Sequence, residues 1–129
     1  MTHPDDETQA LMHKARQALD DARLLLDHNR SEAAVNRIYY AAFNSARAAL
    51  LTKGEAPSSH SGVKARFSYH FARTEQIDRK HGRTLAVAED MRNRADYSAF
   101  TVFEAEAAAD MLVDVEQLVD AVAAMLPAT

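Results

Sequence analysis

Residues 31–54 read SEAAVNRIYYAAFNSARAALLTKG, and the pattern of this stretch recurs along most of the chain. Its apolar side chains return every three or four residues, which is the period of an α-helix with one buried face. Ser31 belongs to the residue types that cap helix N-termini, and Gly54 to the type that follows a C-terminus. The stretch therefore predicts a long helix that buries one face: Val35, Ile38, Tyr39, Ala42, Ala46, Ala49 and Leu50.

Four more helices are predicted on either side of this one. They cover residues 8–28, a short segment after the loop GEAPSSHSG at 54–62, residues 77–93, and residues 101–126. The last is expected to begin at a capping box, Thr101 with Glu104, after the segment RADYSAF at 94–100 breaks the helical pattern. The predicted buried positions are Leu11, Ala15, Ala18, Leu19, Ala22, Leu25, Leu26, Val63, Phe67, Phe71, Leu85, Ala88, Met91, Ala108, Leu112, Val115, Val119, Val122 and Leu126.

These patterns predict an all-α fold, an up-down bundle of four to five helices. The chain has only 3 Gly and 3 Pro, and no segment alternates apolar and polar residues as a half-buried strand would. Its 129 residues suit a single domain, residues 1–129, with a core at about 8–126. Cysteine is absent, and we find no signal peptide and no apolar run long enough for a membrane span. We therefore expect a cytoplasmic protein that does not bind membranes.

Charge is distributed unevenly along the chain. Residues 60–94 carry 8 Lys and Arg against 4 Asp and Glu, whereas residues 95–129 carry 7 acidic residues and no Lys or Arg. A basic middle segment can present a positive surface to an anion although the net charge is −4. The same runs are also what the solvated faces of ordinary helices contain, so both interpretations stay open.

The sequence predicts no metal site and no cofactor. The six histidines, at positions 3, 13, 28, 60, 70 and 81, are not spaced as helical ligand pairs, and we expect them to be scattered over the surface. No glycine-rich phosphate loop, nucleophile elbow or dinucleotide fingerprint is present. Any chemistry is therefore expected to rely on Arg, Asn, Asp, Tyr and His side chains.

The stretch MRNRADYSAF at 91–100 gathers several such side chains. Arg92 can hold a phosphate with two parallel hydrogen bonds, and Asn93 can donate a further one. The alternative is structural: Arg92 and Asp96 are spaced as an i, i+4 ion pair, with Tyr97 packed at the helix end.

Three stretches together resemble the HEPN domain family: NRIYYAAFNSARAALL at 36–51, SSHSGVKARFSYHF at 58–71 and AEDMRNRADY at 88–97. The likeness is to small stand-alone bacterial and archaeal members with an Arg-x-x-Ala-Asp-Tyr-like element, and it spans roughly residues 8–125. It implies a helical bundle that pairs as a homodimer. It also implies a metal-independent ribonuclease, which often acts as a toxin and is neutralised by a minimal nucleotidyltransferase partner serving as antitoxin.

The family's active motif is an arginine, a polar residue directly after it, and a histidine four to six residues further on. Arg92 and Asn93 match the first two positions, but the histidine is missing, because Tyr97, Ser98 and Ala99 stand where it should fall. Metal-free RNA cleavage needs a base for the 2′-hydroxyl, an acid for the leaving oxygen and positive charge on the phosphate. Asp96 is a candidate base, and Tyr97 is a candidate acid or modification site.

Further candidates lie outside this motif. His60 is either a replacement acid or base that reaches the Arg92 cleft, or an imidazole that caps the third helix or faces solvent. Arg37 and Tyr40, together with Arg94, are candidates for RNA contact, although Arg37 and Tyr40 could equally pack at the rim of the core; Tyr39 and Phe43 are expected to be packing residues. The leading hypothesis is a dimeric RNA-directed toxin of a toxin–antitoxin or defence pair. The alternative is a non-catalytic HEPN module that binds a nucleotide or a partner protein.

Overall fold

Helices make up the fold of the described chain. The structure is a computed structural model that describes residues 4–99 and 104–127. Within those ranges it contains no strand, and the helices follow in this order: α1 Pro4–Asp27, α2 Ser31–Leu51, α3 His60–Phe67, the π-helical turn η1 Ser68–Ala72, α4 Lys80–Tyr97 and α5 Ala105–Met125. The predicted all-α bundle is confirmed.

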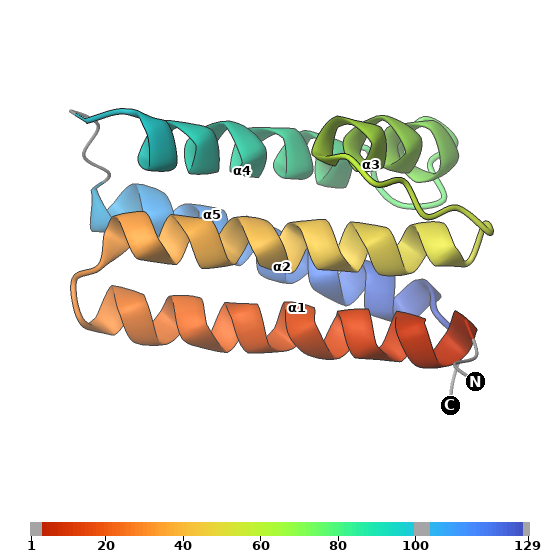
Figure 1. The fold of residues 1–129 in the computed structure, drawn as a ribbon, viewed down its shortest axis with the longest axis horizontal. Helices are drawn as coiled ribbons and strands as arrows, with labels where there is room; N and C mark the ends of the chain where they lie inside the picture. The colour runs from red at the N-terminus through yellow and green to blue at the C-terminus, as the bar shows by residue number, and fades with distance from the viewer. Residues whose placement is uncertain (1–3, 100–103, 128–129) are drawn as a thin grey trace.

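Helix α2 lies at the centre of the bundle. It packs against α1 on one side, against α3 and α4 on the other, and against α5, which also contacts α1 and α4 (Figure 1). The alanines of α2 that face its neighbours are fully buried, and such small side chains let helices approach closely. Larger rings interrupt this alanine-rich face at Tyr39, Tyr40 and Phe43, opposite α3 and α4.

Most of the predicted core positions are buried as expected, although Leu25 is only partly buried and lies outside the core. All seven positions predicted for α2 are at most 1 % exposed, and Val63, Phe67 and Phe71 are completely buried. Leu85, Ala88 and Met91 of α4 also lie in the core. Leu11 and Leu26 of α1 and Leu126, just after α5, are only partly buried and pack at the edge of the same core. Helical periodicity therefore located one continuous core.

The bounds of α4 differ from the prediction of residues 77–93. The helix begins at Lys80 and runs to Tyr97, so the segment predicted to break the pattern is helical as far as Tyr97. Two i, i+4 ion pairs, Asp90 with Arg94 and Arg92 with Asp96, continue the helix where apolar residues become sparse. The continuation keeps Arg92 and Asp96 on one face.

Helix ends also differ in detail from the predicted caps. The N-cap of α2 is Arg30, and Ser31 is the first helical residue. Thr101 of the predicted capping box lies outside the described residues, and Glu104 is itself the extended N-cap of α5 rather than a residue inside the helix. The predicted role of Gly54 is supported, because it adopts a left-handed φ of +72° in the turn after α2.

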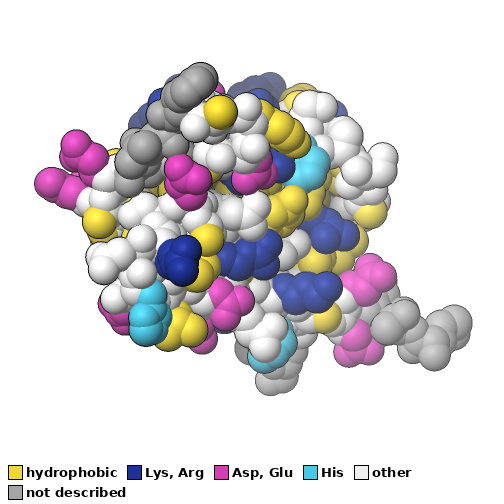
Figure 2. Space-filling view, turned by 60° about the vertical axis from the view of Figure 1, so that its left-hand side comes forward, with side chains coloured by type: hydrophobic (Ala, Val, Ile, Leu, Met, Phe, Trp, Pro, Cys, Tyr) yellow, Lys and Arg dark blue, Asp and Glu magenta, His cyan; other side chains and the backbone are white. Residues whose placement is uncertain are grey.

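Basic and acidic side chains share the surface. Figure 2 shows one face on which several Lys and Arg side chains form a row across the middle, with Asp and Glu side chains beside them. None of the helices in the described ranges combines the length and the apolar character that crossing a membrane requires.

Candidate functional site

Four rings from two helices form one cluster, which we call the ring cluster: Tyr39, Tyr40 and Phe43 of α2 and His60 of α3. His60 stacks on Phe43 with 4.4 Å between ring centroids and an interplanar angle of 20°. Tyr39 stacks against both, at 5.7 Å from Phe43 and 5.6 Å from His60. The imidazole is therefore held flat against aromatic side chains rather than pointing freely into solvent.

The local sequence explains why His60 reaches α2. Ser59 caps α3, and its side-chain oxygen accepts a 2.9 Å hydrogen bond from the backbone N–H of Gly62. This cap fixes His60 as the first residue of the helix, on the side facing the α2 rings. The hypothesis that His60 merely caps the helix is wrong in this detail, because Ser59 performs that role.

Arg92 of α4 lies over the same rings. Its guanidinium carbon is 5.0 Å from the ring centroid of Tyr39 and 6.0 Å from that of Tyr40. Nη1 donates to Oδ2 of Asp96 over 3.3 Å, and only 12 % of the Arg92 side chain is exposed. The expected i, i+4 pair is therefore present, in a sheltered position against aromatic faces.

The environment of Arg92 keeps it charged. Burial alone lowers the pKa of Arg92, but the hydrogen bond to Asp96 and the neighbouring Tyr40 and Tyr39 leave that pKa above its ordinary value. Its Nε is buried and has no hydrogen-bond partner in the described structure. A buried donor of this kind is costly to leave unpaired.

The hydroxyl of Tyr39 connects His60 to an acidic residue. It lies 2.5 Å from Nδ1 of His60 and donates to Oε2 of Glu89 over 3.4 Å. Lys64 in turn places Nζ 3.0 Å from Oε1 of Glu89. Burial, followed by the charge of Glu89, raises the pKa of Tyr39 well above its ordinary value, so the phenol stays protonated.

Sequence reasoning missed this connection. Tyr39 packs in the core as predicted, but we had assigned no role to its hydroxyl, to Glu89 or to Lys64. Glu89 precedes Arg92 by three residues and shares its face of α4, which is the one signal that the sequence offered.

The other predicted residues divide into two groups. Arg37 joins the site, with its guanidinium 5.1 Å from the Tyr40 ring and hydrogen bonds to the side chain of Asn36. Asn93 is exposed, and Arg94 is exposed and paired with Asp90 over 3.1 Å. Tyr97 is 79 % exposed, so the alternative in which its ring packs the helix end is wrong.

A surface groove of about 420 Å³ adjoins the site between α1, α2 and α4. Arg37 and Asp96 both line it, so a ligand entering there would meet the edge of the Arg92–Asp96 pair. The remaining lining residues are Leu25, Glu32, Ala33, Asn36 and Ala95.

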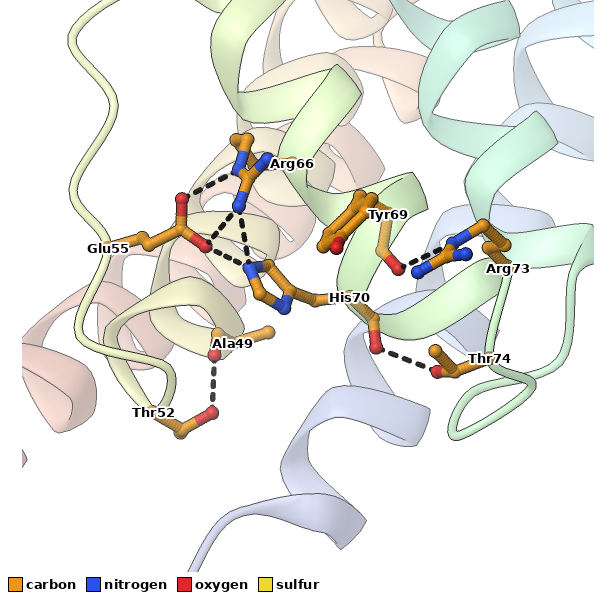
Figure 3. Close-up of polar contacts among 8 residues, drawn as sticks. All are labelled: Ala49, Thr52, Glu55, Arg66, Tyr69, His70, Arg73 and Thr74. Carbon is orange, nitrogen blue, oxygen red and sulfur yellow. Dashed lines mark hydrogen bonds and ion pairs between the residues drawn. The ribbon is translucent and has the colours of Figure 1, made fainter.

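A second polar cluster lies beside the C-terminal end of α2 (Figure 3). Glu55 accepts hydrogen bonds from Arg66 at 2.7 and 3.1 Å and also contacts His70 Nε2. The hydrogen bond from Arg66, together with His70, lowers the pKa of Glu55. The Tyr69 ring lies beside this cluster, with the guanidinium groups of Arg66 and Arg73 4.6 and 4.3 Å from its centroid. This cluster ties the loop after α2 to α3 and η1.

The histidines are less superficial than predicted. His81 is only 5 % exposed, its Nδ1 has no partner within the described residues, and burial lowers its pKa. His60 and His70 are half-buried in the two clusters above, whereas His13 and His28 are exposed and His3 lies outside the described residues. In the described part of the chain, no three His, Asp or Glu side chains converge as metal ligands would.

Comparison with known proteins identifies a family and several relatives that this chain resembles. A family model described as the HEPN domain matches residues 8–125. A "UPF0332 protein" of Thermotoga maritima is 40% identical over 109 residues, which cover 84% of this chain and 83% of the relative. "Putative toxin MJ0605" of Methanocaldococcus jannaschii is 36% identical over 115 residues, 89% of this chain and 85% of the relative. "Putative toxin MJ0142" of the same organism is 34% identical over 106 residues, 82% and 72% of the two chains.

Proposed function

Because this chain belongs to the HEPN domain family, we propose that it is an RNA-directed toxin whose metal-independent ribonuclease cleft is built on Arg92 and His60. One observation carries the proposal: two residues 32 positions apart in the sequence both contact the Tyr39 ring, one as a sheltered cation and the other as an imidazole. A phosphate-binding charge and a titratable base are the groups that such a reaction requires.

In this proposal Arg92 binds the scissile phosphate. Its guanidinium can present two N–H donors to phosphate oxygens, and 12 % of the side chain remains exposed for that contact. Negative charge on the phosphate grows as the 2′-oxygen attacks, so a fixed cation stabilises the transition state more than the bound substrate.

His60 takes the place of the missing motif histidine. When the Tyr39 hydroxyl donates to Glu89, it accepts from Nδ1–H of His60, and Nε2 keeps the lone pair that a general base needs. His60 then removes the proton of the RNA 2′-hydroxyl, the 2′-oxygen bonds to phosphorus, and the bond from phosphorus to the 5′-oxygen breaks. The departing 5′-oxygen takes a proton, for which Tyr97 is the candidate donor.

The proposal includes two partners. A second copy of the chain would complete the cleft, and exposed apolar side chains on α4, Val87 at 48 % and Tyr97 at 79 %, offer surface for it. A minimal nucleotidyltransferase would act as antitoxin, and support for that pairing comes from the family resemblance and from the toxin names of two relatives.

A second candidate function is a non-catalytic HEPN module that binds a nucleotide or a partner protein. It is favoured by the absence of a histidine after Arg92 and by the exposed position of Asn93, whose side chain forms no hydrogen bond within the described residues. A binding module would use the same sheltered arginine without needing His60 as a base.

Expression in a bacterial host, without any partner gene, tests the proposed function. We expect the wild-type chain to arrest growth, and Arg92→Ala, Arg92→Lys and His60→Ala to relieve the arrest at equal soluble protein levels. Arg16→Ala is the matched control, because Arg16 also pairs with an aspartate, Asp120 at 2.7 Å, but on the α1–α5 side. Normal growth with the wild-type chain would contradict the toxin and favour the binding module. Arrest with Arg92→Ala would contradict the assignment of the cleft to Arg92.

A further inference from the structure

We infer that the groove between η1 and the first half of α4 binds the sugar–phosphate backbone of the RNA that enters the Arg92 cleft. This inference rests on the proposed function and adds a binding site to it. The groove has a volume of about 470 Å³, and Lys64, Arg73, Arg79 and Arg83 line it beside the small residues Ser68 and Gly82. No acidic residue lines it.

The positive charge of this groove is only partly neutralised. Arg79 pairs with Glu75 over 3.4 Å at a highly exposed site, and Lys64 pairs with Glu89. The side chain of Arg83 forms no ion pair or hydrogen bond within the described residues. Arg73 donates only to the backbone oxygen of Tyr69 and stacks on its ring, which contributes no negative charge. Arg73 and Arg83 therefore have no directly paired acid, although the carboxylate of Asp78 acts on Arg83 from nearby, and their positive charge can attract an anionic ligand.

Small residues of η1 and α4 pack closely together at the floor of this groove. A side chain added to Gly82 would meet Cβ of Ala72 at 3.0 Å, so Gly82 is what lets η1 approach α4. The π-helical turn is marked by the hydrogen bond from Arg73 N to Ser68 O at 2.8 Å, and such turns are frequent at functional sites. Arginines therefore extend from a narrow, rigid floor.

The groove leads to the proposed cleft. Lys64 lines the groove and also holds Glu89, whose other oxygen accepts from the Tyr39 hydroxyl. Along α4, Arg83 precedes Arg92 by nine residues, which is roughly 14 Å of rise and about two and a half turns, so the two side chains leave opposite faces of the helix. An RNA strand that occupies both places must therefore pass around α4 on the side of Lys64 and Glu89, a path of a few nucleotides.

An RNA backbone fits these side chains better than an acidic protein surface does. Arginine outnumbers lysine three to one in the groove, and its planar fork matches phosphate oxygens bidentately. Phosphates follow one another along a single strand, which suits a groove lined by four cations. The experiment below distinguishes RNA from an acidic protein as the ligand of this groove.

Fluorescence anisotropy with a labelled 2′-O-methyl oligouridylate tests the groove separately from cleavage, because that probe lacks the 2′-hydroxyl that the reaction needs. We expect Arg73→Ala/Arg83→Ala to weaken binding and to make the slope of log affinity against log salt shallower by about 1.4, from two phosphates at about 0.7 each. The control is Arg16→Ala/Arg23→Ala, which removes two arginines that pair with acids on the α5 side and should leave affinity and slope unchanged.

Three outcomes would contradict the proposal that this groove binds RNA. The first is wild-type affinity in the Arg73/Arg83 variant, and the second is an equal loss of affinity in the control variant. The third is that the Arg73/Arg83 variant loses as much affinity for poly-L-glutamate of matched charge as for the RNA probe, which would indicate a groove for acidic proteins. The two proposals can fail separately. If the wild-type chain binds the probe through Arg73 and Arg83 but cleaves no RNA, the groove proposal stands and only the ribonuclease proposal is contradicted.

Discussion

Replacing Tyr39 with phenylalanine separates the positioning of His60 from simple packing. The change keeps the ring, which is 1 % exposed, and removes only the hydroxyl. The hydrogen bond to Glu89, at 3.4 Å, is long and therefore weak. The loss of stability is calculated from the 2.5 Å bond to His60 Nδ1. One such bond contributes about 1 kcal/mol of net stability.

This free energy converts into a measurable melting shift. At about 2.1 cal/mol/K per residue, the 129 residues give an unfolding entropy of roughly 0.27 kcal/mol/K, so about 1 kcal/mol lowers the melting temperature by roughly 4 °C. Circular dichroism would follow the transition. RNA cleavage should fall as well, because His60 loses the group that orients it.

Tyr40→Phe provides the matched control. It makes the same chemical change one residue further on, where the hydroxyl forms no hydrogen bond within the described chain. We expect its melting temperature to stay within about 1 °C of wild type, since the ring and its packing are kept and no hydrogen bond is lost. If Tyr39→Phe melts like Tyr40→Phe, the hydroxyl does not hold His60 and the reasoning fails.

Three further predictions concern assembly, the Arg92–Asp96 pair and pH. Light scattering after size exclusion should give twice the 14.3 kDa chain mass; a monomer at high concentration would contradict a cleft shared between subunits. In urea unfolding, Arg92→Ala should cost about 1–2 kcal/mol, from its cation–π contacts and packing, and Asp96→Ala about 0.5 kcal/mol; equal costs would refute the sheltered position of Arg92. Because burial lowers the pKa of His81, the unfolded chain binds a proton more readily, so wild-type stability should fall as pH drops below about 6.5. His81→Gln should reduce that loss, and an unchanged pH dependence would show that His81 does not cause it.

The fold was largely predictable because the spacing of apolar side chains determines most of it. The stripes of α1, α2 and α5 have the helical period, and every residue predicted for α2 is in the core. The end of α4 was mispredicted, because residues 94–97 offer few apolar side chains and the helix there depends on ion pairs. Such pairs are too weak individually for their pattern to outweigh a break in periodicity.

The site was predictable only in part. Arg92 and Asp96 were found together because four residues along a helix make neighbours. The contact of His60 with Tyr39 joins residues 21 positions apart, and Glu89 lies 50 positions from Tyr39. No local pattern encodes either distance. The burial of His81, which is 5 % exposed, was equally hidden, since it depends on how α4 packs against the rest of the bundle.

Cleavage of RNA by the purified chain, free of any partner and in the presence of EDTA, tests the central claim most directly. The account predicts fragments with 5′-hydroxyl and 2′,3′-cyclic phosphate ends from wild-type protein, and none from Arg92→Ala or from 2′-O-methyl RNA. If wild-type protein leaves RNA intact under these conditions, the ribonuclease is contradicted and only the binding module stands.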